Sequence, residues 1–189
     1  MPSGITHDRI TLWTLPWITL GTYILTRHGE ATLLLSGGFL FSGLMFGPDL
    51  DIYSVQYKRW GILRAIWRPY RKLCRHRSIF SHGPIIGTLL RVFYLLIVIA
   101  FCGMLFVAIA QLIFGFDWNW QQFTRQQLFL LKTKYFTETL ALFVGLEFGA
   151  MSHYLSDLIT SGYQRRLKNS GKKPKNSRNL VNFKQAQRK

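Results

Sequence analysis

Apolar residues gather in four long runs that short polar segments separate. The runs cover about residues 11–26, 31–47, 92–116 and 139–160. The third run holds about 25 residues without a charge, and at 1.5 Å per residue a helix of that length crosses the ~30 Å hydrocarbon core of a bilayer. We therefore predict a transmembrane helix at 92–116.

The first two runs are shorter, at about 16 to 17 residues each, so buried core helices are an alternative to membrane spans. The polar turn at 27–30 between them favours a transmembrane hairpin. With the third and fourth runs, this predicts an all-α integral membrane bundle with about four transmembrane helices. We expect it to occupy residues 1–163.

The fourth run differs from the others because it contains ionisable residues. Glu147, His153 and Asp157 lie among apolar side chains, so they must face protein or water rather than lipid. Gly145 and Gly149, four residues apart, would allow a neighbouring helix to approach closely. These residues predict a helix that packs against other helices and contributes ionisable side chains to a functional site.

Two further segments are basic. Between Lys58 and Arg68, Trp60, Leu63 and Trp67 repeat at helical spacing before Pro69, which predicts an interfacial amphipathic helix, or one that packs on the other helices. Residues 164–189 hold ten cations and no acids and predict a disordered tail. The tail is either solvated or attached to anionic lipid.

The composition explains where these cations belong. The 189 residues are 49% hydrophobic, yet 24 Lys and Arg against 8 Asp and Glu give a net charge of +16. Such cations lie beside lipid headgroups, phosphate substrates or nucleic acid. Short cytoplasmic loops carry the Lys and Arg excess of membrane proteins. The N-terminus, the 51–83 loop and the tail hold most of the cations, so we place both termini in the cytoplasm. The other side holds Arg27, Arg125, Lys132 and Lys134.

This orientation fixes the expected partners. Membrane lipid is the main one, with anionic headgroups bound through the basic loop and the tail. Nucleic acid is not expected, although a tail that serves as a nucleic-acid or protein-binding arm is a third alternative. The two cysteines, Cys74 and Cys102, form neither a disulfide framework nor a metal motif and fit a reducing compartment.

Most of the His and Asp residues lie in short clusters at the cytoplasmic ends of the predicted spans. His153 and Asp157 are four apart, so both side chains reach one face of a helix. The Asp-x-Asp pair follows a helix stop at Gly47-Pro48, on irregular backbone that can point both carboxylates the same way. The candidate metal ligands are His7, Asp49, Asp51, His76, His82, His153 and Asp157.

Imidazole and carboxylate ligands together suit Zn, with Mn or Fe(II) as alternatives. So many ligands exceed the needs of one tetrahedral ion, and a dinuclear centre with ions roughly 3.5–4 Å apart would use them all. Arg77 is expected to bind the phosphoryl group of a substrate, and Asp8 and Ser81 to support the ligands.

Each cluster also has a structural interpretation. His153 and Asp157 could form a hydrogen bond that locks two helices, and the Asp-x-Asp pair could be a solvated turn. His7 could be an ordinary terminal polar residue, His76 a headgroup-facing loop residue and Arg77 a lipid contact. Asp8 could be a first-turn acid behind a Thr6 N-cap.

The order of these motifs resembles the bacterial membrane-bound metal-dependent hydrolases. The pattern is an early His, then Pro-Asp-x-Asp-His, then His-Arg-Gly-x-Thr-His-Ser, then a Gly-rich helix with His-x-x-x-Asp. The matching segments here are His7, Pro48-Asp49-Leu50-Asp51, His76-Arg77-Ser78-Ile79-Phe80-Ser81-His82 and Gly149 to Asp157. Ile52 stands where the pattern has His, and Gly83 where it has Ser.

The opening segment from Pro2 to Thr11 is similar to a metal-binding membrane family found mainly in cyanobacteria. These resemblances cover most of residues 1–165 and imply metal binding more directly than a reaction. We expect a membrane-bound, metal-dependent hydrolase acting on a phosphoester near the bilayer. The alternative is a non-catalytic metal protein, such as a sensor, a carrier or a closed structural site.

Overall fold

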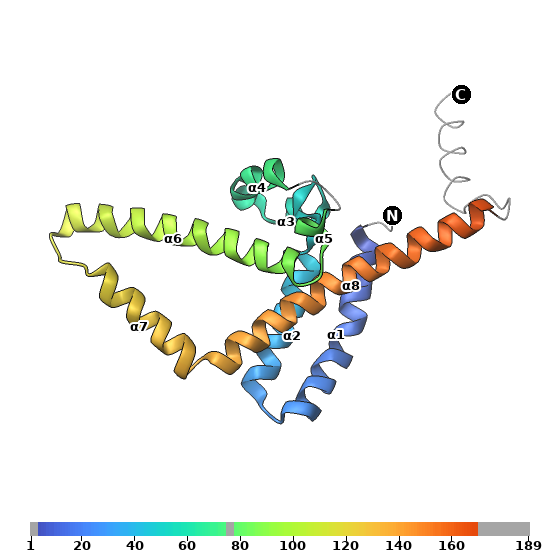
Figure 1. Cartoon of the computed structure of the whole chain (residues 1–189), viewed down its shortest axis with the longest axis horizontal. Coiled ribbons are helices and arrows are strands. Elements are labelled where there is room, and N and C mark those ends of the chain that lie inside the picture. The colour runs from blue at the N-terminus through green and yellow to red at the C-terminus, as the bar shows by residue number, and fades with distance from the viewer. Residues whose placement is uncertain (1–3, 75–77, 170–189) are drawn as a thin grey trace.

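The computed structural model describes residues 4–74 and 78–169, and every regular element within them is a helix (Figure 1). This confirms the predicted all-α class. The helices are α1 (Gly4–Thr26), α2 (Gly29–Leu44), η1 (Pro48–Asp51), α3 (Val55–Arg59), η2 (Gly61–Ile66), α4 (Trp67–Leu73), α5 (Ile79–His82), α6 (Ile86–Phe114), α7 (Trp120–Thr133) and α8 (Phe136–Asn169).

Helices α1, α2 and α8 form a bundle with α2 between the other two (Figure 1). The contact between α2 and α8 is close because glycines line it. A Cβ built on Gly145 would lie 2.1 Å from the carbonyl oxygen of Leu35, and one on Gly149 would lie 2.5 Å from that of Phe39. The predicted close approach at this pair of glycines is confirmed.

The segment between α2 and α6 packs as an aromatic cluster rather than as one interfacial helix. The predicted helix at 58–68 is wrong, because the chain breaks at Gly61, whose φ of 55° lies in the left-handed region. Trp67 is fully buried, and its ring packs 5.6 Å from those of Phe46 and Tyr70, centroid to centroid. Pro69 does not end a helix but lies in the first turn of α4, where backbone N–H groups need no partner within the helix.

Helix α6 leaves the bundle after its first turns. Gly87, Thr88 and Arg91 are buried, whereas no residue of its apolar stretch is, and α6 alone among the described helices is long and apolar enough to cross a membrane. Helix α7, which the apolar pattern did not predict, returns from the far end of α6 to the start of α8 (Figure 1).

The four predicted runs are therefore all helical, but the structure supports only one as a candidate membrane span. Helix α2 has 16 residues, which reach about 24 Å, short of the hydrocarbon thickness of ~30 Å. Helix α8 continues to Asn169, so the expected boundary of the tail at 163/164 falls inside a helix. Residues 170–189 lie outside the described part of the chain.

Candidate metal centre

Four separate elements bring the predicted ligands together. His7 comes from the start of α1, Asp49 and Asp51 from η1 after α2, and His82 from the end of α5. His153 and Asp157 come from the middle of α8. His76 and Arg77, the other two predicted site residues in the α4–α5 link, lie outside the described residues.

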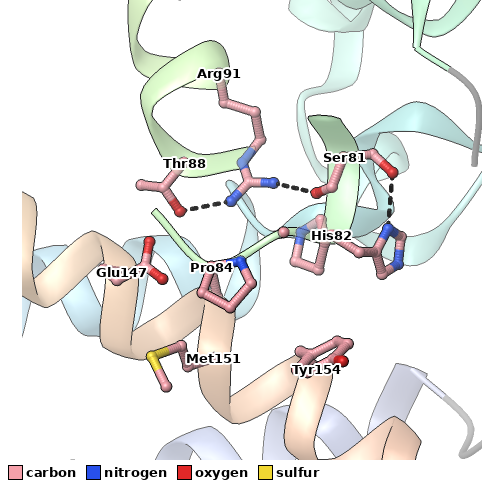
Figure 2. Close-up of a pocket in the computed structure, with 11 residues that line it drawn as sticks. Ser81, His82, Pro84, Thr88, Arg91, Glu147, Met151 and Tyr154 are labelled. Atoms are coloured by element: carbon pink, nitrogen blue, oxygen red, sulfur yellow. Dashed lines mark hydrogen bonds between the residues drawn. The ribbon is translucent and has the colours of Figure 1, made fainter. Parts of the chain in front are cut away.

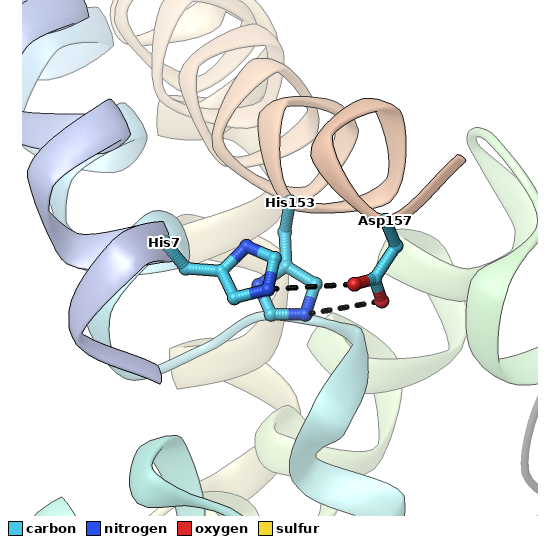
Figure 3. A group of neighbouring side chains, drawn as sticks. All are labelled: His7, His153 and Asp157. Atoms are coloured by element: carbon cyan, nitrogen blue, oxygen red, sulfur yellow. Dashed lines mark ion pairs between the residues drawn. The ribbon is translucent and has the colours of Figure 1, made fainter. Parts of the chain in front are cut away.

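The first ligand group consists of His7, His153 and Asp157 (Figure 3). Each of these buried residues offers one ligand atom, and the three atoms lie within 4.8 Å of one another. Nε2 of His7 is 3.4 Å from Oδ1 of Asp157, and Nε2 of His153 is 3.9 Å from Oδ2. The two imidazole rings stack at 3.8 Å. His153 and Asp157 thus share a helix face, as their spacing predicted.

Ser156 sets the orientation of the His7 ring. Its hydroxyl donates to the carbonyl oxygen of His153 at 2.8 Å and lies 2.7 Å from Nδ1 of His7. A hydroxyl has one proton to give, so Nδ1 of His7 must be the donor in the second bond. In a neutral imidazole, Nε2 then carries the lone pair, and this is the atom that faces Asp157.

The second ligand group consists of Asp49, Asp51 and His82. Nε2 of His82 lies 3.8 Å from Oδ1 of Asp49, and its Nδ1 lies 3.9 Å from Oδ2 of Asp51. Ser81 places its hydroxyl 2.8 Å from Nδ1 of His82, which fits its expected supporting role (Figure 2). The other oxygen of Asp49, Oδ2, is 3.2 Å from Nε2 of His153, so Asp49 joins the two groups.

The electrostatics favour the protonation states that bind cations. Burial lowers the pKa of His7 below its ordinary value of 6.5, and the nearby His153 lowers it further. Burial by itself raises the pKa of Asp49, but the imidazoles of His153 and His82 outweigh that effect and hold the pKa well below its usual range. Neutral imidazole and ionised carboxylate are the forms that bind a divalent metal.

Several buried ligand-type atoms of the centre have no hydrogen-bond partner among the described residues. They are Oδ1 of Asp49, Nδ1 and Nε2 of His153, and Oδ1 of Asp157. Leaving such groups without a partner costs folding free energy, and in native proteins they usually have one. A bound cation would satisfy the two carboxylate oxygens and one imidazole nitrogen, so the residues fit a metal ion.

The structure also gives the contacts of Asp8, which was predicted to belong to the site, and of Ser156, which was not. Asp8, expected to support the ligands, instead forms a bidentate salt bridge with Arg59, and its helix begins at Gly4, so Thr6 is not an N-cap. Sequence reasoning missed Ser156, which adjoins Asp157 but whose partner His7 lies 149 residues away in the chain. It also missed the burial of Arg91, which is 1% exposed.

Residues 2–167 match a protein family described as "Uncharacterized metal-binding protein (DUF2227)". The chain belongs to this family. Metal binding by the family agrees with the His and Asp cluster, and neither indicates which metal is bound. A curated relative from Aquifex aeolicus (strain VF5), described as an uncharacterized protein, is 41% identical over 59 residues. That match covers 31% of this chain and 41% of the relative, less than half of its length. No solved structure matches the chain.

Proposed function

We propose that this member of the metal-binding family is a membrane-bound hydrolase of phosphoesters that uses two divalent cations. Zn is the preferred metal, with Mn or Fe(II) as alternatives, because imidazole and carboxylate ligands are mixed. The position of Asp49 carries the proposal. One carboxylate oxygen faces His153 of the first ligand group and the other faces His82 of the second.

A carboxylate between two ligand groups is suited to hold a pair of ions. His7, His153 and Asp157 would bind one ion and His82 and Asp51 the other, with Asp49 shared. Ions held there would supply a bound water of lowered pKa and positive charge to neutralise the charge that develops on a phosphoryl group.

Other residues of the chain would orient the ligands and bind the substrate. Ser156 keeps Nε2 of His7 directed at Asp157, and Ser81 keeps His82 directed at Asp49. Asp49 and Asp157 are the most exposed of these side chains, at 18% and 12%, so substrate would approach from their side. Arg77 remains the proposed phosphoryl-binding residue from the sequence.

Exposed apolar surface supports a membrane location. The apolar stretch of α6 is unburied, and Trp13 and Trp17 on α1 are 79% and 72% exposed. Large exposed apolar surfaces are unfavourable in water, and tryptophan is enriched where lipid meets water. The proposed substrate is therefore a phosphoester presented at the bilayer.

One observation favours the alternative of a non-catalytic site. His7, Asp51 and His153 are each no more than 7% exposed, so protein covers most of the ligands. A closed metal site has all its coordination positions filled by protein, whereas a catalytic site keeps one for water or substrate.

Metal content and turnover separate these functions. Full-length protein purified in detergent should bind two Zn²⁺ per chain, and His153→Ala and Asp157→Ala should each lower the bound metal, because each removes a ligand of the first group. His28→Ala is the matched control, because His28 only caps the start of α2 at the opposite end from η1. Equal metal loss in His28→Ala would contradict the assignment of the ligands.

Turnover is measured on phosphodiesters in anionic vesicles, with and without Zn²⁺. Asp51→Asn keeps the size of the side chain but removes its charge. It should therefore reduce turnover clearly while changing the thermal unfolding temperature little. A metal-loaded wild type without activity on a broad panel of phosphoesters, together with an Asp51→Asn variant that is only less stable, would support the non-catalytic alternative.

A further inference from the structure

The connection that carries His82 from α5 into α6 is strained. Ile85, three residues after His82, has φ of 64° in the left-handed region. A β-branched side chain rarely adopts this conformation, and it persists only where the surroundings hold it. The residues that hold this connection therefore decide where His82 points.

Two buried side chains of opposite charge hold the connection from either side (Figure 2). Arg91 donates from one terminal nitrogen to the carbonyl oxygen of Ser81 at 2.9 Å, and from the other to the hydroxyl of Thr88 at 2.9 Å. Glu147 of α8 accepts from the backbone N–H of Ile85 at 2.9 Å. His82 lies between these two anchored points.

The contacts of Arg91 lead directly to a proposed ligand. Ser81, whose carbonyl binds Arg91, places its hydroxyl 2.8 Å from Nδ1 of His82. The opposite nitrogen of that ring faces Asp49 at 3.8 Å. Arg91 is only 1% exposed, and a guanidinium is kept in such surroundings only when its partners compensate for the lost water.

We infer that Arg91 is a positioning residue of the metal centre, which fixes Ser81 and through it holds His82 against Asp49. The inference rests on the proposed function, because it assigns Arg91 to the second ion of the proposed pair. The ion held by His7, His153 and Asp157 does not depend on Arg91, because these residues belong to α1 and α8 and Arg91 has no hydrogen bond to them.

The test is a titration of the metal-free, full-length protein in detergent with Co²⁺, followed by calorimetry and by the visible spectrum of the bound ion. Wild type should bind two ions. Arg91→Met should bind the first ion normally and the second at least tenfold more weakly, since residues that orient ligands change metal affinity by about 10- to 100-fold. His82→Ala should weaken the same second ion at least as much, to an affinity that the titration still measures.

A double variant shows whether Arg91 acts through His82. Adding Arg91→Met to His82→Ala should cause no further loss of Co²⁺ affinity, because the group that Arg91 positions is already absent. Arg91→Lys keeps the charge and one donor and should recover part of the affinity. Arg125→Met makes the same change on exposed α7 and should leave both ions and the spectrum unchanged.

The outcomes separate this inference from the proposed function. A wild type that binds one ion overturns both. A wild type with two ions and an Arg91→Met variant that binds both with unchanged affinity overturns the role of Arg91 alone. The same holds if Arg91→Met weakens the binding of both ions while His82→Ala weakens the binding of only one. If Arg91→Met does not fold, Arg91→Lys decides, and full affinity for the second ion overturns the inference.

Discussion

The contact between α2 and α8 offers a quantitative test of how the fold positions the metal centre. Gly145→Ala adds a Cβ that would lie 2.1 Å from the backbone oxygen of Leu35, whereas ordinary contacts begin at 3.4 Å. One helix must therefore move by about 1.3 Å, the difference of these two distances. Metal–ligand distances tolerate only about 0.2 Å.

The expected effect follows from two opposing contributions. Overpacking a tight interface costs about 1–3 kcal/mol, and replacing a mid-helix glycine by alanine returns about 1 kcal/mol. Gly145→Ala should therefore destabilise the protein by up to about 2 kcal/mol. It should also weaken Zn²⁺ binding, because α8 carries His153 and Asp157. We expect a loss of affinity on the order of tenfold, which corresponds to about 1.4 kcal/mol of binding free energy.

Gly37→Ala is the matched control. Gly37 lies on α2, and a Cβ there would meet no atom within 4 Å. The same chemical change should stabilise the protein by about 1 kcal/mol and leave metal affinity unchanged. Thermal unfolding by circular dichroism and Zn²⁺ titration measure both effects. If the two alanine variants behave alike, the close glycine contact does not position the centre.

Three other predictions follow from single residues. Because burial and His153 lower the pKa of His7, the stability of the metal-free protein should be full above pH 6.5 and fall as the pH drops through that lowered pKa. In unfolding measurements, His7→Gln should reduce this sensitivity to acid, and His28→Gln should not. Asp8→Asn should leave Zn²⁺ stoichiometry unchanged and alter stability by less than about 1 kcal/mol, because its carboxylate pairs with an exposed arginine. In a Cys74→Ser background, Cys102 on α6 should resist a membrane-impermeant maleimide in vesicles and react after detergent is added; rapid labelling in intact vesicles would contradict a bilayer location for α6.

Local sequence patterns suffice to predict the helices with long apolar runs and the residue types of the metal centre. Apolar content along 92–116 predicts a helix in a bilayer, because a segment surrounded by lipid must pair its own backbone groups. The four-residue spacing of His153 and Asp157 places both on one helix face through local geometry alone. These features depend on neighbours in the chain, so a sequence pattern can predict them.

The way in which the ligands are held depends on contacts between distant segments of the chain. The bond between Ser156 and His7 joins residues 149 positions apart, and the anchoring of Ser81 by Arg91 depends on how α5 folds back on α6. The break at Gly61 and the burial of Trp67 likewise arise because an aromatic cluster outweighs the local amphipathic pattern. Such contacts depend on packing between distant segments, and their free energies do not appear in any local pattern of residues.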